Sequence, residues 1–169
     1  TSADAEYSDE AKAHLSRFLS KQKYALVTEL TAANFEETVR NPEDALVVLA
    51  ALSDSIHGDE VASTASDGIA RKDAEIAALR SVALEWRLKK EASSSRQVVF
   101  AWIDADRWKS PLRKLYGIQA SDSPSAVLVD GNKSLYYELY HYADAKPATF
   151  EHQWITPTSV FADIDRVLS

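Results

Sequence analysis

The sequence ALVVLAALSDSIH, residues 45–57, contains the segment that decides the fold. Its first seven residues are all apolar, which is typical of a central strand that is covered on both faces of an α/β sheet. The polar and small residues at 53–67 then predict a long loop. A second apolar run, residues 98–103, predicts another buried strand.

Shorter elements surround these two strands. Helices are predicted at residues 8–21, 31–39, 69–91, 108–116 and after 156–157, and strands at 24–28, 125–129 and 135–142. The order predicts a parallel β-α-β unit with a right-handed crossover. Asp130-Gly-Asn132 then predicts a tight turn that joins the last two strands as an antiparallel hairpin.

Composition excludes several classes of function. The 169 residues carry a net charge of −7, whereas binding to nucleic-acid phosphates needs a basic face. No apolar run approaches the roughly 20 residues of a membrane-spanning helix. A phosphate loop, a dinucleotide-binding motif and a Ser-His-Asp order are all missing, so no cofactor is expected. The chain has no methionine, and we expect it to be a piece of a longer protein.

Several short motifs, taken in order, resemble the protein disulfide isomerase family. They are LTAANF at residues 30–35, the apolar strand at 45–51, FAWIDA at 100–105, YGI at 116–118 and SPSAVLV at 123–129. The resemblance implies a thioredoxin-like fold, a central mixed sheet of 4–5 strands with helices on both faces. It also implies that Pro124 follows a cis peptide bond, an arrangement confined almost wholly to proline.

This chain departs from the family pattern in two respects. The positions where a Cys-x-x-Cys pair would stand are occupied by Asp54 and His57, and the chain contains no cysteine. Thiol exchange by this chain is therefore excluded, and we predict that it is not an enzyme. The segment at about 53–71 is longer than in the family, which predicts an enlarged loop after the second strand.

The resemblance also implies a domain organisation. Residues 1–22 would form an N-terminal helix or a linker from a preceding domain, and residues 23–169 would form the thioredoxin-like domain. Asp54 and His57, with Asp59 and Glu60, have the side chains of a metal site, so a metal-dependent enzyme is one alternative. A solvated polar loop is the interpretation we favour, and no metal is expected.

Family members without the cysteine pair bind unfolded chains or partner proteins in a hydrophobic cleft. The resemblance therefore implies a client-binding domain of the endoplasmic reticulum lumen. Candidate peptide-binding residues are Leu52, Ile56, Trp108, Ser123 and Pro124, of which Leu52 and Ile56 are expected to be exposed. For Trp102 and Tyr116 we favour core packing. The alternative is a structural domain that spaces catalytic domains or recruits a dedicated partner protein through the enlarged loop.

Two further features lie near the predicted hairpin. Asn132-Lys133-Ser134 is an N-glycosylation sequon, which is usable only in a secretory compartment. In the last strand, alternation predicts Tyr136, Tyr140 and Tyr142 on one face of the sheet and Tyr137 on the other. We attribute these tyrosines to strand propensity and packing rather than to an aromatic docking surface.

Overall fold

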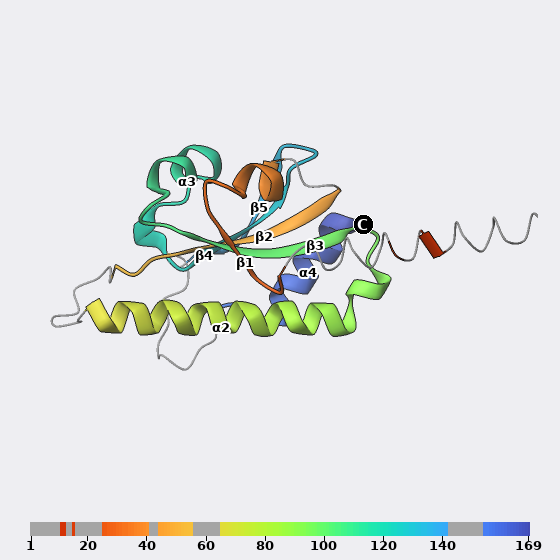
Figure 1. Cartoon of the computed structure of the whole chain (residues 1–169), viewed down its shortest axis with the longest axis horizontal. Coiled ribbons are helices and arrows are strands. Elements are labelled where there is room, and N and C mark those ends of the chain that lie inside the picture. The colour runs from red at the N-terminus through yellow and green to blue at the C-terminus, as the bar shows by residue number, and fades with distance from the viewer. Residues whose placement is uncertain (1–10, 13–14, 16–24, 41–43, 56–64, 142–153) are drawn as a thin grey trace, which may run out of the picture.

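The computed structural model describes residues 11–12, 15, 25–40, 44–55, 65–141 and 154–169 (Figure 1). These residues contain a five-stranded sheet with the order β1-β3-β2-β4-β5. The strands are β1 (Thr28–Leu30), β2 (Ala45–Leu52), β3 (Gln97–Asp104), β4 (Ser125–Asp130) and β5 (Leu135–His141). β1, β3 and β2 are parallel, whereas β4 is antiparallel to β2 and β5 to β4. The predicted mixed sheet with its final hairpin is therefore confirmed.

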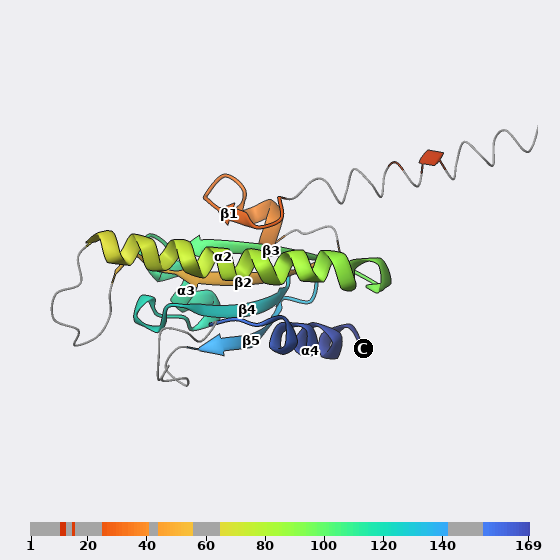
Figure 2. The same ribbon diagram turned by 90° about the horizontal axis from the view of Figure 1, so that it is seen from below.

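Helices cover both faces of this sheet. They are the π-helix η1 (Glu36–Arg40), α2 (Ala65–Lys89), the 3-10 helix η2 (Glu91–Ser93), α3 (Lys109–Tyr116), the 3-10 helix η3 (Ala120–Asp122) and α4 (Pro157–Leu168). Figures 1 and 2 show the long α2 running along one face, which it shares with α4, while η1 and α3 lie on the other. In the part of the chain that the structure describes, no helix is both long and apolar enough to cross a lipid bilayer.

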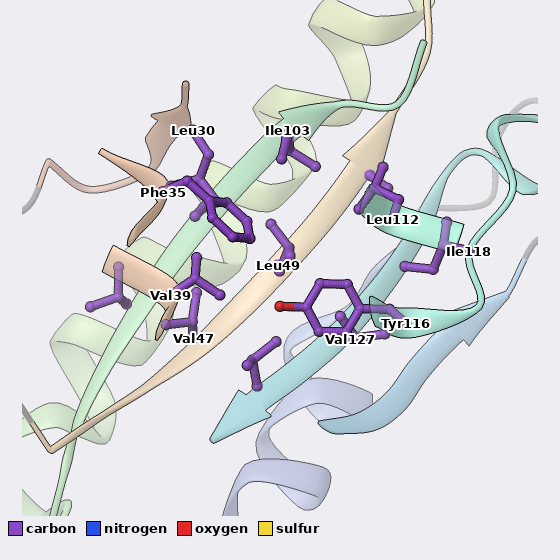
Figure 3. Close-up of a cluster of buried hydrophobic side chains, with 14 of the residues drawn as sticks. Leu30, Phe35, Val39, Val47, Leu49, Ile103, Leu112, Tyr116, Ile118 and Val127 are labelled. Atoms are coloured by element: carbon purple, nitrogen blue, oxygen red, sulfur yellow. The ribbon is translucent and has the colours of Figure 1, made fainter. Parts of the chain in front are cut away.

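The apolar run of β2 is buried because the strand pairs on both sides and is covered on both faces. Alternation sends Val47 and Leu49 into a core beneath η1 and α3 (Figure 3). Phe35 enters this core from one side, and Tyr116 enters it from α3. Such interdigitation of side chains from helix and sheet is the principal source of stability in an α/β fold.

A second core fills the opposite face of the sheet. Leu46 and Val48 of β2 meet α2 and α4 there. The ring of Trp86 packs edge-on against Phe161, with 5.2 Å between ring centroids. Because this core takes side chains from α4, the last helix is part of the same folded unit as the sheet.

Local signals explain where several helices begin and end. Thr156 caps α4 through its side-chain oxygen, which accepts a hydrogen bond from the Ser159 N–H at 3.4 Å, and Pro157 occupies the first turn. Gly117 ends α3 with φ of 68°, the left-handed conformation predicted for a C-cap glycine.

The starts of β1 and α2 differ from prediction. β1 begins at Thr28, whereas the strand was predicted at 24–28, because pairing with residues 101–103 of β3 selects the later residues. α2 begins at Ala65 rather than at Ile69, so residues 65–71 are helical and not part of the enlarged loop. Packing of this first turn against the end of β2 overrides its Ser-Asp-Gly composition. Residues 56–64 and most of the predicted segment 1–22 lie outside the described residues.

Candidate functional site

Three strand termini meet at one end of the sheet. Because β2 and β3 are parallel and β4 is antiparallel to β2, the last residues of β2 and β3 lie beside the first of β4. The Ala105 N–H donates to the Leu52 carbonyl at 2.7 Å, and the Ser123 hydroxyl donates to the Ala51 carbonyl at 3.2 Å. We call residues 51–55, 104–106 and 123–125 the site end of the sheet.

Asp106 is the hydrogen-bond acceptor that ties the site end together. Its Oδ2 accepts from the hydroxyls of Ser53 at 2.5 Å and Ser55 at 3.2 Å. Burial opposes ionisation of this carboxyl group, but the hydrogen bonds from Ser53 and Ser55 prevail and lower the pKa of Asp106. The Asp106 carboxylate thus binds Ser53 and Ser55, the residues immediately before and after Asp54.

Two cations of α2 bind the same segment from the other side. Lys72 Nζ lies 2.6 Å from Asp54 Oδ1 and 5.4 Å from the ring centroid of Trp102, a cation–π distance. Arg71 Nη2 donates to the main-chain carbonyls of Ser53 at 3.4 Å and Ser55 at 2.8 Å. Where the family resemblance places a thiol, the structure therefore has an ion-paired carboxylate.

This ion pair bears on the alternative of a metal site. Asp54 contacts a cationic side chain, and the described residues contain no group of three or more His, Cys, Asp and Glu side chains that could hold a metal ion. His57, Asp59 and Glu60 lie outside the described residues. A metal site that uses them stays an untested hypothesis.

The candidate peptide-binding residues differ in accessibility. Leu52 is fully buried, so the prediction that it is exposed is wrong. β2 is paired on both sides up to Ala51, Leu52 itself still pairs with Asp104 of β3, and its side chain enters the core beneath α2. Ser123 and Pro124 are also buried, and the bond between them is cis, as predicted. Ile56 lies outside the described residues.

Of the four candidates that the structure describes, Trp108 is the accessible one. It is half-buried at the start of α3 and stacks on Phe35, with ring centroids 5.0 Å apart and an interplanar angle of 30°. Trp102 is also half-buried but packs against the core on the opposite face. The site end is therefore flanked by one partly exposed indole on each face of the sheet.

The tyrosines behave largely as structural residues. Tyr116 is buried, as we favoured, and burial raises its pKa to about 12. It contacts the ring of Tyr136 edge-on at 5.4 Å. Tyr137 packs against the core on the other face, which confirms the predicted alternation for these two residues.

Sequence reasoning missed Arg71, Lys72 and Asp106. The two cations resemble ordinary charges on a helix surface, and no local pattern links them to residues 53–55. Asp106 did carry a signal, because it follows a buried strand predicted to be parallel to β2, and such strands end at the same side of a sheet. The remaining candidate, Asn132, lies at the opposite end of the sheet, beside Asp44.

Comparisons with known proteins agree with this architecture. Residues 1–152 match the sequence family described as a thioredoxin-like domain. The zinc-bound form of human ERp44 superposes with a TM-score of 0.55 at 13% identity, covering 89% of this chain and 33% of that one. Form I of human ERp44 gives 0.48 at 18% identity, covering 85% and 29%. The bb fragment of ERp72 gives 0.49 at 13% identity, covering 92% and 54%.

The chain thus spans about a third of the length of the zinc-bound ERp44 chain. No curated protein matches it in sequence. The family match covers most of the chain, and the sheet order and helix placement agree with it. This chain belongs to the family of thioredoxin-like domains.

Proposed function

We propose that this chain is a redox-inactive domain of a protein disulfide isomerase-type protein that binds unfolded or client polypeptides in the endoplasmic reticulum lumen. One observation carries the proposal. The site end retains its three converging strand termini, but it presents Asp54 paired with Lys72 where a thiol would stand. The chain has no cysteine, so any action on a client at this site proceeds without thiol exchange.

Aromatic surface near the site end supports peptide binding. Trp108 and Phe35 form a stacked pair on the face that carries α3, and the exposed part of an indole ring offers a rigid apolar contact that loses little entropy on binding. The motifs at 30–35 and 100–105 support kinship with disulfide isomerases and, through it, the lumenal location. Burial of client apolar side chains against Trp108 would supply the affinity.

A binding titration tests this proposal. A dye-labelled, reduced and alkylated unfolded protein is titrated with the chain, and fluorescence anisotropy is recorded. We expect saturable binding that Trp108→Ala weakens about fivefold or more, because truncating an interface aromatic often costs over about 1 kcal/mol. Leu88→Ser is the matched control, since Leu88 is 76% exposed on α2, and its affinity should equal that of the wild type.

Circular dichroism shows whether each variant is folded before it is titrated. The proposal would be wrong if the wild-type chain shows no saturable binding. It would also be wrong if a folded Trp108→Ala variant binds as tightly as the wild type, because the indole would then contribute nothing.

A second candidate function is docking of a neighbouring domain or a dedicated partner. Leu84 and Leu88 favour it, since they lie one turn apart on α2 and are 46% and 76% exposed. Because the chain has no cysteine, Leu88→Cys accepts a single environment-sensitive dye. Docking predicts that flanking domains of the same protein shift this emission and that an unfolded client does not. An emission that flanking domains leave unchanged would contradict this candidate.

A further inference from the structure

The turn between β4 and β5 presents an asparagine at the end of the sheet opposite the site end. Asn132 and Ser134 are both exposed in this turn. The turn follows Asp130, the last residue of β4, whereas the first residue of β4 belongs to the site end. A group attached to Asn132 would therefore project away from Asp54 and Trp108.

The polypeptide around Asn132 is well anchored. Asp130 is buried and accepts two hydrogen bonds from the Arg96 guanidinium, at 2.8 and 3.0 Å. Across the turn, the Lys133 N–H donates to Asp130 Oδ1 at 3.4 Å. The Ser134 N–H donates to the Gly131 carbonyl at 3.3 Å. The exposed Asn132 thus lies on a turn whose backbone is held by these hydrogen bonds.

Among the described residues, the side-chain amide of Asn132 donates one of its two hydrogens. Its Nδ2 donates to Asp44 Oδ1 at 3.2 Å, and a primary carboxamide carries two N–H hydrogens. Substitution of the second hydrogen leaves the first in place for Asp44. A modification at Nδ2 is therefore compatible with the folded turn.

We infer that Asn132 is an N-glycosylation site, an inference that rests on the lumenal location in the proposed function. The co-reactant is an oligosaccharide linked to a lipid pyrophosphate. A bond forms between Nδ2 and C1 of the first sugar, the bond from C1 to the phosphate oxygen breaks, Nδ2 loses one proton, and the lipid pyrophosphate leaves. Ser134 supplies the hydroxyl that the acceptor motif requires.

The sequence allows no other acceptor. Its asparagines are Asn34, Asn41 and Asn132. Asn34 has Glu36 two residues later, and Asn41 precedes a proline, so neither begins a sequon. A glycan on this chain therefore identifies Asn132 without further mapping.

The experiment expresses the chain behind a secretory leader in eukaryotic cells, with a reporter sequon appended after Ser169. Molecules whose reporter carries a glycan have reached the compartment of glycosylation, and only these are analysed by intact mass before and after a peptide N-glycosidase. We expect a second glycan in the wild type and in Ser134→Thr. It should be absent in Ser134→Ala, the matched control that keeps Asn132 and its contact with Asp44.

A reporter glycan without a second one in the wild type would overturn the inference, and so would a second glycan that persists in Ser134→Ala. Client binding is measured separately on unglycosylated chain made in bacteria, so the two proposals fail independently. Because Asn132 lies far from the site end, glycosylated and unglycosylated chains should bind the unfolded protein with equal affinity.

Discussion

Gly68, in the first turn of α2, lies directly against the main-chain carbonyl of Asp54. A Cβ atom at position 68 would be 2.0 Å from that oxygen and 3.1 Å from the carbonyl carbon. Both obstacles belong to the backbone, so no side-chain rotation relieves them. The absence of a side chain at Gly68 therefore lets α2 begin close enough for Arg71 to donate to the Ser55 carbonyl.

Gly68→Ala should destabilise the protein. Alanine is the better helix former by about 1 kcal/mol, but overpacking of a close contact costs about 1–3 kcal/mol, and the contact here is with backbone. We expect a lower midpoint of thermal unfolding, by a few degrees at about 2–4 °C per kcal/mol. Ser81→Ala, on an exposed position of the same helix, should be neutral or stabilising. A Gly68→Ala protein at least as stable as the wild type would contradict this account.

Asp106→Ala should loosen the site end. Ser53 and Ser55 would lose a common charged acceptor, and a hydrogen bond to a charged group contributes about 1.5–3 kcal/mol. Urea denaturation measures the loss. The control is Lys109→Ala. The Lys109 side chain is 66% exposed and its ammonium lies 3.9 Å from Asp106, and an exposed pair contributes under about 1 kcal/mol. Equal losses in the two variants would show that the serine hydrogen bonds contribute nothing.

The central strands and the hairpin could be predicted from sequence because their signals are local. Residues 45–51 and 98–103 are continuous apolar runs, and burial on both faces of a sheet leaves no alternative position for them. Asp130-Gly-Asn132 marks the turn by composition alone. The order of these elements sufficed for the fold class.

The candidate site is built from contacts that no local pattern records. Ser53 and Asp106 are 53 residues apart in sequence, and Arg71 and Ser55 are 16 residues apart. Leu52 follows the apolar run and precedes polar residues, so the sequence alone did not distinguish a strand end in the core from an exposed one. Long-range packing decided each case.

Glu75→Gln should stabilise the protein at alkaline pH. Burial raises the pKa of Glu75 to about 7, against the opposing charges of Arg71 and Lys72. A raised carboxyl pKa means that the folded state binds the proton more tightly, so the free energy of unfolding falls as pH rises from about 4.5 to about 7. Above about pH 7, ionised Glu75 lowers the free energy of unfolding by on the order of 3 kcal/mol, as a pKa shift of this size implies.

Chemical denaturation at pH 5 and pH 8 checks this prediction. The Gln variant should resemble the wild type at pH 5 and exceed it at pH 8. Glu85→Gln controls for the loss of one negative charge, since Glu85 pairs with Lys89 on the same helix. If Glu75→Gln and Glu85→Gln change the pH dependence equally, burial of Glu75 is not the cause.

Asp130→Asn should be the most destabilising of these changes at neutral pH. Asp130 is fully buried, and its carboxylate holds Arg96 through two hydrogen bonds. Removing one charge of a buried pair costs about 3–5 kcal/mol, because the other charge stays desolvated. Replacing both residues, as in Arg96→Met with Asp130→Leu, should recover much of the loss. Lys133→Ala, 3.8 Å from Asp130 but 60% exposed, is the control and should cost under about 1 kcal/mol.

The pH dependence separates this pair from Glu75. Hydrogen bonds from Arg96 hold the pKa of Asp130 below its usual value, so its contribution is present at neutral pH and is lost as pH falls through the folded-state pKa. Glu75 acts in the opposite direction and at higher pH. Urea titrations between pH 2 and pH 8 should therefore show the Asp130→Asn deficit shrinking only in strong acid. A deficit that stays constant down to pH 2 would mean that the Arg96–Asp130 charge interaction does not stabilise the fold.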